Sequence, residues 1–178
     1  VCIYQGEELG LQEADVAFED LQDPYGIEFW PDFKGRDGCR TPMVWEKSNQ
    51  NSGFSDSDKT WLPVSPDHLG LSVAQSEADE NSIIHHYRRA IALRQSHDAL
   101  KSGTCSPMSV SDGCPIFTRA GAEEEIYCAF NLTDDTVALD VPTGDWQVID
   151  TTLNSAAPAG GKLNLGPWQP CILQRKLT

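Results

Sequence analysis

The pattern of apolar residues divides the chain into stretches of different character. Residues 1–4 form a short apolar run that predicts a buried strand. Residues 13–70 show no sustained helical or strand period, apart from one turn of helix near 18–21. From residue 81 to residue 101 apolar positions recur at helical spacing, with Asn81 as a candidate N-cap and Gly103 as a stop. We therefore expect one helix of about five turns there.

Strand-type runs follow Gly103, separated by turn signals such as Asp112-Gly113 and Gly144-Asp145. Within residues 125–131 the side chains alternate in a way that predicts a strand with core on one face. About 75 residues leave no room for crossover helices, so the pattern predicts an antiparallel sheet or sandwich. The runs are 116–119, 125–131, 137–141, 146–150, 162–165 and 171–174.

The aperiodic stretch, residues 13–70, is rich in aromatic residues, which linkers seldom contain. A stretch this long inside a compact domain is typical of a functional loop. Its aromatic side chains need a scaffold or a ligand to pack against. They are Phe18, Tyr25, Phe29, Trp30, Phe33, Trp45, Phe54 and Trp61.

Charge narrows the possible partners. The 178 residues include 27 acidic and 13 basic side chains, for a formal net charge of -14. That charge repels nucleic acid and anionic lipid, and no apolar run approaches the ~20 residues of a membrane-spanning helix. We expect no nucleic-acid partner and no membrane partner. A neutral or cationic ligand is favoured.

The six cysteines show no Cys-x-x-Cys spacing and no companion histidines at zinc-ligand spacing, so neither a metal site nor a cofactor is expected. An even number also permits three disulfides. Cys2, Cys128 and Cys171 stand in apolar, strand-like contexts that favour buried thiols. Free thiols indicate a reducing compartment, so we expect a cytoplasmic protein. His85, His86 and His97 are expected on a helix surface.

Few carboxylates offer a catalytic arrangement. Glycoside cleavage needs two facing carboxyl groups, but Glu7 and Glu8 on an extended strand would point to opposite sides. Asp56 and Asp58 are expected to cap a turn. No Gly-x-Ser-x-Gly elbow, phosphate loop or Rossmann glycine pattern occurs.

Two arginines, Arg36 and Arg40, lie in a glycine-bracketed turn within residues 35–45. An arginine can bridge a carboxylate and a neutral hydroxyl-bearing ligand, because its planar fork offers five donors and a permanent charge. The alternative is that these arginines only tie a long loop together. Composition does not decide between the two.

Four motifs follow one another in order along residues 2–103. They are Cys2-Ile3-Tyr4-Gln5-Gly6-Glu7-Glu8-Leu9-Gly10-Leu11, Gly35-Arg36-Asp37-Gly38-Cys39-Arg40-Thr41-Pro42-Met43-Val44-Trp45, Gly53-Phe54-Ser55 with Trp61-Leu62-Pro63-Val64, and Tyr87-Arg88-Arg89-Ala90-Ile91-Ala92-Leu93-Arg94. In this order they resemble the α-glucosidase and oligo-1,6-glucosidase branch of the α-amylase family, glycoside hydrolase family 13, over its C-terminal portion. The later strands are similar to the family's C-terminal domain.

The resemblance implies a fragment of an α/β (β/α)8 barrel, with its last strand, long active-site loop and last helix, followed by an antiparallel all-β sandwich domain. Residues 1–103 would end the catalytic barrel, and residues 104–178 would form the β domain. The family's catalytic carboxylates would lie upstream, so no catalytic residue is assigned here. Arg40 matches the family's arginine near the cleaved glucose and is the expected substrate-binding residue.

The function this implies is that of the C-terminal part of a retaining exo-α-glucosidase or transglucosidase, which hydrolyses or transfers glucose from small α-glucosides. Its partners would be a small α-glucoside and the N-terminal remainder of the same enzyme. Two alternatives stay open. One is a non-catalytic carbohydrate-binding β module, although the aromatic residues precede the β region. The other is a non-hydrolytic family member, such as a transporter subunit.

Overall fold

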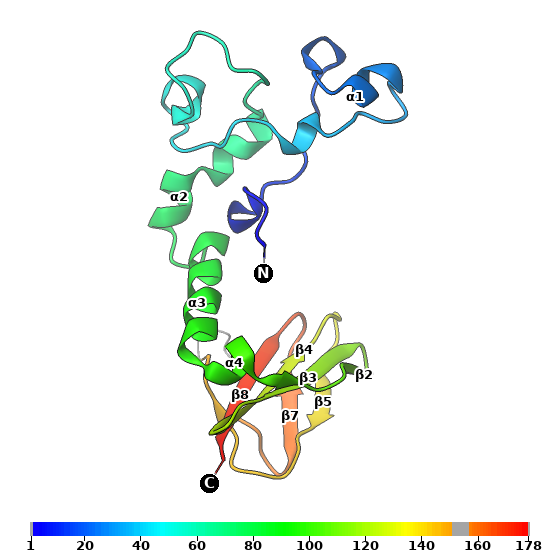
Figure 1. Ribbon diagram of the computed structural model, residues 1–178, viewed down its shortest axis with the longest axis vertical. Helices are drawn as coiled ribbons and strands as arrows, with labels where there is room; N and C mark the ends of the chain where they lie inside the picture. The colour runs from blue at the N-terminus through cyan, green and yellow to red at the C-terminus, as the bar shows by residue number, and fades with distance from the viewer. Residues whose placement is uncertain (1, 151–156, 178) are drawn as a thin grey trace. The chain divides into compact units, whose positions relative to one another are not determined.

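The computed structural model describes residues 2–150 and 157–177. The chain divides into two compact units, Val1–Ala90 and Ile91–Thr178. Figure 1 labels the α-helices and many of the strands.

Short helices and turns build the first unit. Its α-helices are α1 (Pro24–Glu28) and α2 (Val73–Ala78), and α3 (Ile83–Ser96) begins within it. Val16, Leu21 and Leu62 form a small buried cluster, with Trp30 packed against it. The 3-10 helices are η1 (Glu7–Leu9), η2 (Phe18–Asp20), η3 (Asp37–Cys39), η4 (Gln50–Gly53) and η5 (Pro66–Leu71).

The start of the chain differs from expectation. Residues 2–4 have no regular structure, and Cys2, Ile3 and Tyr4 are exposed, so the predicted strand and the predicted burial of Cys2 are wrong for the described residues. A strand forms only where a neighbour pairs with its backbone groups, and no described strand pairs with this segment. The helical turn predicted near 18–21 is present as η2.

The long helix is broken into two. α3 begins at Ile83, two residues after the predicted N-cap, and α4 (Asp98–Ser102) follows after His97, whose backbone is extended (φ -120°, ψ 117°). None of the described residues of α3 is buried, although an apolar face was predicted. His97 leaves the helical path because the side chain of Glu124 holds both its ring and the start of α4.

Two antiparallel sheets form the second unit, as predicted. In the larger sheet the strands run in the order β1-β3-β4-β8-β6, and β2 also pairs with β3. The smaller sheet pairs β5 with β7. The strands are β1 (Thr104–Cys105), β2 (Ser109–Ser111), β3 (Cys114–Ala120), β4 (Glu124–Phe130), β5 (Val137–Asp140), β6 (Gln147–Val148), β7 (Lys162–Leu165) and β8 (Pro170–Lys176).

The central strand β4 is buried on both faces. Tyr127 and Ala129 join a core with leucines and valine of β5 and β7, while Ile126 and Cys128 pack with Ala99 of α4. The prediction of core on one face only was therefore wrong for β4, because α4 covers the face of Ile126 and Cys128 while β5 and β7 cover the opposite face. Burial of Cys128 and Cys171 is confirmed.

Candidate functional site

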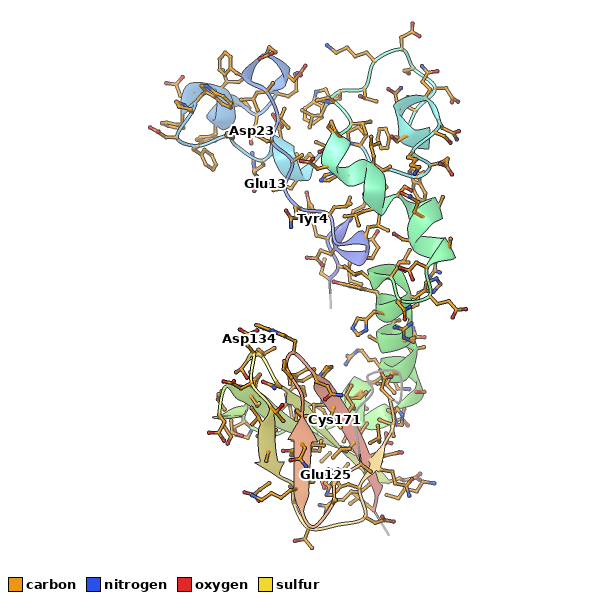
Figure 2. The ribbon with its side chains drawn as sticks, turned by 180° about the vertical axis from the view of Figure 1, so that it is seen from behind. Tyr4, Glu13, Asp23, Glu125, Asp134 and Cys171 are labelled. Carbon is orange, nitrogen blue, oxygen red and sulfur yellow. The ribbon has the colours of Figure 1, made fainter. Side chains whose placement is uncertain are left out.

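A groove of about 400 Å³ lies in the first unit between the start of the chain and the η3 turn. The residues that line it include Tyr4, Glu7, Glu13, Arg40 and His68. Tyr4, Glu13 and Asp23 follow one another along this part of the chain in Figure 2. The groove therefore combines carboxylates, a guanidinium, an imidazole and a phenol.

The η3 turn presents Arg40 to this groove. The Arg40 N–H donates to the Asp37 carbonyl (2.9 Å), which closes the turn, and the side chain is exposed. Within the described residues the Arg40 guanidinium makes no hydrogen bond or ion pair. Its donors are thus available to a ligand or to another part of the protein.

Arg36, four residues earlier, is engaged instead. Its Nε donates to Asp23 Oδ2 at 3.0 Å, and its backbone N–H donates to the same oxygen at 3.0 Å. The Arg36 guanidinium lowers the pKa of the Asp23 carboxyl against the opposing effect of burial. For Arg36 this pair supports the alternative in which the arginine ties the loop together. The two arginines of the turn therefore differ in kind.

Two glycines explain how the turn can form. Gly35 has φ +75°, a conformation that side chains rarely adopt, and Gly38 lies so close to the neighbouring backbone that a Cβ would stand 2.4 Å from the Ala14 carbonyl oxygen. Ala14 also donates its N–H to the Gly38 carbonyl at 3.0 Å. The glycines at positions 35 and 38 are thus required by a tightly packed turn.

Glu7 and Glu8 do not face each other as an acid and a nucleophile. Glu7 Oε2 accepts the N–H of Tyr4 (3.2 Å), and Glu8 Oε2 accepts the N–H of Gly6 (2.8 Å). Both carboxylates belong to η1 rather than to the expected strand. Their predicted structural role is confirmed, because each satisfies a backbone donor.

His68 is a groove residue that the sequence did not single out. It is buried, and its Nε2 lies 2.8 Å from the Gln12 carbonyl oxygen, while Nδ1 is buried without a partner in the described part of the chain. A single histidine outside any periodic pattern carries no signal of this position. The position of His68 at the groove becomes apparent only from its contact with Gln12, which lies 56 residues earlier in the sequence.

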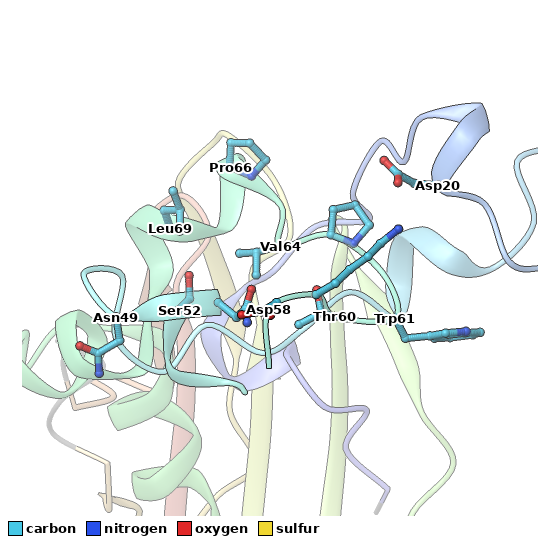
Figure 3. A pocket seen from close by; sticks show the side chains of 12 residues that line it. Asp20, Asn49, Ser52, Asp58, Thr60, Trp61, Val64, Pro66 and Leu69 are labelled. Atoms are coloured by element: carbon cyan, nitrogen blue, oxygen red, sulfur yellow. The ribbon is translucent and has the colours of Figure 1, made fainter. Parts of the chain in front are cut away.

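A second groove, of about 440 Å³, lies beside Trp61 and is lined also by Asn49, Asp58 and Lys59 (Figure 3). Among the described contacts, the side chains of Asp56 and Asp58 accept no hydrogen bond. Their predicted turn-capping role therefore has no support in the structure. Trp61 is exposed, as are most of the aromatic residues of this stretch.

Two negative findings concern residues 2–150 and 157–177. No group of three or more His, Cys, Asp or Glu side chains there could hold a metal ion. No described helix has the length and apolar character needed to cross a membrane.

Comparison with known proteins gives the class to which this fold and groove belong. The model of the α-amylase catalytic domain matches residues 1–103, which is more than half of the chain. The chain therefore belongs to the α-amylase family.

The similar proteins are α-glucosidases and oligo-1,6-glucosidases. The chain is 51% identical over 142 residues to a probable α-glucosidase of Rhizobium meliloti (strain 1021), covering 80% of this chain and 25% of the relative. It is 30% identical over 166 residues to an oligo-1,6-glucosidase of Heyndrickxia coagulans, covering 83% of this chain and 30% of that one. The chain thus spans between a quarter and a third of the length of these relatives.

Solved structures agree. The α-glucosyl transfer enzyme XgtA superposes with a TM-score of 0.84 at 41% identity, over 97% of this chain and 32% of XgtA. An isomaltulose synthase mutant from Erwinia rhapontici, solved with sucrose, superposes with a TM-score of 0.77 at 27% identity, over 97% of this chain and 34% of the synthase.

Proposed function

We propose that this chain is the C-terminal part of a retaining exo-α-glucosidase or transglucosidase acting on small α-glucosides. In this proposal residues 1–103 complete a (β/α)8 barrel with its last strand, active-site loop and last helix, and residues 104–178 form the β domain. The match of the family model to residues 1–103 supports that division, although the second compact unit already begins at Ile91. A cytoplasmic location stays a prediction.

The observation that carries the proposal is the Arg40 guanidinium, which has no partner among the described residues and lines a groove of a chain from this family. A glucoside is neutral and rich in hydroxyl groups, so it binds through directed hydrogen bonds rather than through net charge. The Arg40 fork supplies several donors in one plane. It could hold a sugar hydroxyl and a carboxylate together, which fixes the sugar relative to the reacting groups.

The chemistry itself belongs to the N-terminal remainder of the enzyme, the second proposed partner. In a retaining mechanism an aspartate displaces the leaving group and forms a glucosyl-enzyme intermediate, and water or another hydroxyl compound then receives the sugar. Hydrolysis and transfer are therefore outcomes of one intermediate. In this proposal the role of this chain is to bind and orient the glucoside.

The test is kinetic and uses the complete enzyme. Arg40→Lys keeps the charge but loses the planar fork, so kcat/KM on an aryl α-glucoside should fall by an amount equivalent to roughly 2–4 kcal/mol, with little change in Tm. Arg36→Lys is the matched control. It breaks the contact with Asp23 and should lower Tm more than kcat/KM. Near-normal kcat/KM in folded Arg40→Lys and Arg40→Ala enzymes would reject the proposed role.

A further inference from the structure

A buried carboxylate stands three residues before Arg40. Asp37 is fully buried, and its Oδ2 accepts the backbone N–H groups of Gln22 (2.6 Å) and Asp23 (2.7 Å). Its other oxygen, Oδ1, is buried with no partner in the described part of the chain. Burying a charged group costs free energy unless hydrogen bonds offset the loss of water. A turn at the protein surface does not need a buried charged group in order to form. Asp37 therefore calls for a specific explanation.

The contacts of Asp37 join two segments that are distant in sequence. Asp23, whose backbone N–H donates one of these bonds, caps α1 by accepting the Tyr25 N–H (3.1 Å), and its carboxylate also binds Arg36. The backbone at Gln22 and Asp23 is thereby held against the η3 turn by two carboxylates in succession. These hydrogen bonds connect the start of α1, in the aperiodic stretch, to the turn that carries Arg40.

Every residue between Asp37 and Arg40 is also fixed through its backbone. The Gly38 carbonyl accepts the Ala14 N–H (3.0 Å), and the Cys39 carbonyl accepts the Tyr4 hydroxyl (3.3 Å). Arg40 itself donates its N–H to Asp37. The chain is therefore restrained up to the Cα of Arg40, whereas the Arg40 guanidinium has no partner among the described residues. The position of the Arg40 Cα and the direction in which the side chain leaves it are therefore fixed before a ligand binds.

We propose that Asp37 is a positioning residue for Arg40. Its carboxylate locks the η3 turn so that Arg40 leaves the backbone at the angle needed to reach the glucoside, and the ligand does not have to order the turn when it binds. This inference rests on the proposed function, in which Arg40 binds the sugar. Asp37 acts through Arg40 and touches no substrate.

The test is a double-mutant cycle in the complete enzyme, with Asp37→Ala, Arg40→Ala and the double variant assayed on an aryl α-glucoside. Asp37→Ala should lower kcat/KM by about 10- to 100-fold, the range that a misplacement of about 1 Å produces. In the Arg40→Ala background the same change should cause no further loss, because the residue that it positions is gone.

Asp37→Asn keeps the test open if the alanine variant folds poorly. The amide retains an oxygen for the Gln22 and Asp23 donors and places its NH2 group where Oδ1 lacks a partner. This variant should recover most of the activity lost in Asp37→Ala. Asn131→Ala is the matched structural control, since Asn131 is buried and hydrogen-bonded in the β unit. Its effects on kcat/KM and on the urea midpoint should add to those of Arg40→Ala.

The outcomes separate the two proposals. Losses that add in the Asp37 and Arg40 double variant, with Arg40→Ala alone impaired, would overturn the positioning role and leave the proposed function intact. Normal kcat/KM in folded Arg40→Ala would reject the binding role of Arg40, and with it the role of Asp37. A loss in Asp37→Ala that disappears in the Arg40→Ala background supports the inference.

Discussion

Cysteines illustrate how burial controls chemistry at the scale of single residues. Cys105 and Cys128 belong to the same unit, but Cys105 is exposed and Cys128 lies in the core between β4 and α4. Burial raises the pKa of the Cys128 thiol to about 12. The thiolate is the reactive form, so Cys128 lacks both access and ionisation at neutral pH.

Brief alkylation with iodoacetamide at pH 8 should therefore modify Cys105 and leave Cys128 unmodified in the folded protein. Peptide mass spectrometry measures each site separately. In urea sufficient to unfold the chain, both cysteines should react at similar rates, which serves as the control. Equal labelling of Cys128 and Cys105 without denaturant would contradict the burial of Cys128.

Residue-scale features of the site could be predicted only in part. The glycine bracket and the two arginines are visible in the sequence, but the distinction between them depends on Asp23, which lies 13 residues before Arg36. Asp37 stands in a polar turn sequence that usually meets water, and yet it is fully buried. Sequence pattern reports local preference, whereas these roles arise from contacts between segments.

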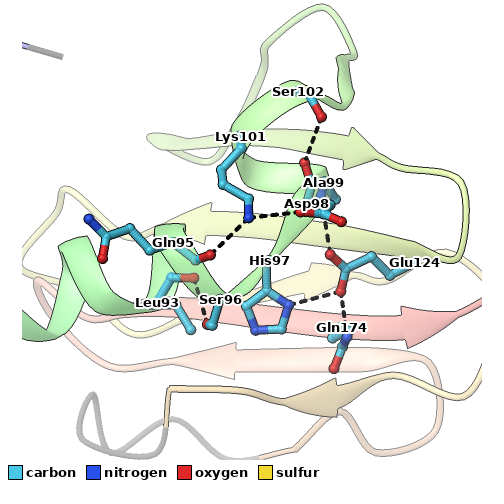
Figure 4. Close-up of polar contacts among 10 residues, drawn as sticks. All are labelled: Leu93, Gln95, Ser96, His97, Asp98, Ala99, Lys101, Ser102, Glu124 and Gln174. Carbon is cyan, nitrogen blue, oxygen red and sulfur yellow. Dashed lines mark hydrogen bonds and ion pairs between the residues drawn. The ribbon is translucent and has the colours of Figure 1, made fainter.

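At the scale of elements, one carboxylate connects the end of the helical region to the sheet (Figure 4). Glu124 of β4 accepts the Ala99 N–H at the start of α4 (3.1 Å), the Gln174 amide of β8 (2.6 Å) and the ring Nδ1–H of His97 (2.8 Å). Arg119 of β3 donates to the carbonyl of Ala99, near the start of α4, and to the carbonyl of Gly103, which follows its last residue. The short helix is thus held at both ends.

The balance of effects on Glu124 gives its contribution a definite dependence on pH. Burial raises the pKa of this carboxyl, but the bonds from His97, Ala99 and Gln174 outweigh burial and leave the pKa below its ordinary value. A carboxyl whose pKa is lowered by folding stabilises the protein above its unfolded-state pKa. That stabilisation is lost as pH falls through the folded-state pKa.

Glu124→Gln should therefore destabilise the β unit by roughly 1–2 kcal/mol at pH 7, since hydrogen bonds to a charged acceptor are lost. The difference from the wild type should be smaller at pH 3, because lowering the pH toward the folded-state pKa of Glu124 begins to protonate the carboxyl. Urea unfolding at both pH values measures it, with the exposed neighbour in Glu123→Gln as the control. An equal loss at pH 7 and pH 3 would show that the charge of Glu124 does not matter.

Elements of the β unit were the most predictable, because alternating side chains and glycine turns are local signals. The break in the helix at His97 was not predictable, since its cause, Glu124, lies 27 residues later. The strand expected at residues 1–4 failed for a related reason. An apolar run has strand character only in the presence of a partner strand.

At the scale of the whole molecule, the two units differ in how much core each contains. The β unit has two buried clusters, one between its sheets and one beneath α4. Among residues 2–90 the first unit has one small cluster around Leu62, and many of its aromatic side chains are exposed, including Tyr25, Phe29 and Trp61. Burial of apolar area is the main source of folding free energy.

We expect residues 91–178 to fold as a separate chain, whereas residues 1–90 should not. Excised 91–178 should unfold cooperatively in urea, and its slowest-exchanging amides should lie in β4 and β8, which pair along their whole length. Limited proteolysis of the 178-residue chain should remove much of residues 1–70 first. The strands after residue 103 should survive, because their backbone groups are paired within the unit.

Hydrogen exchange read by mass spectrometry tests this expectation without relying on cleavage sites. Amides in peptides from β4 and β8 should exchange many-fold more slowly than amides in peptides from the aperiodic stretch, residues 13–70. Fragment 1–90 alone is the control, and it should exchange rapidly throughout. Protection of residues 1–70 equal to that of β4 would contradict the expectation. It would mean that the small cluster around Leu62 and the hydrogen bonds of Asp23 and Asp37 stabilise the first unit to the same degree as the two sheets stabilise the second.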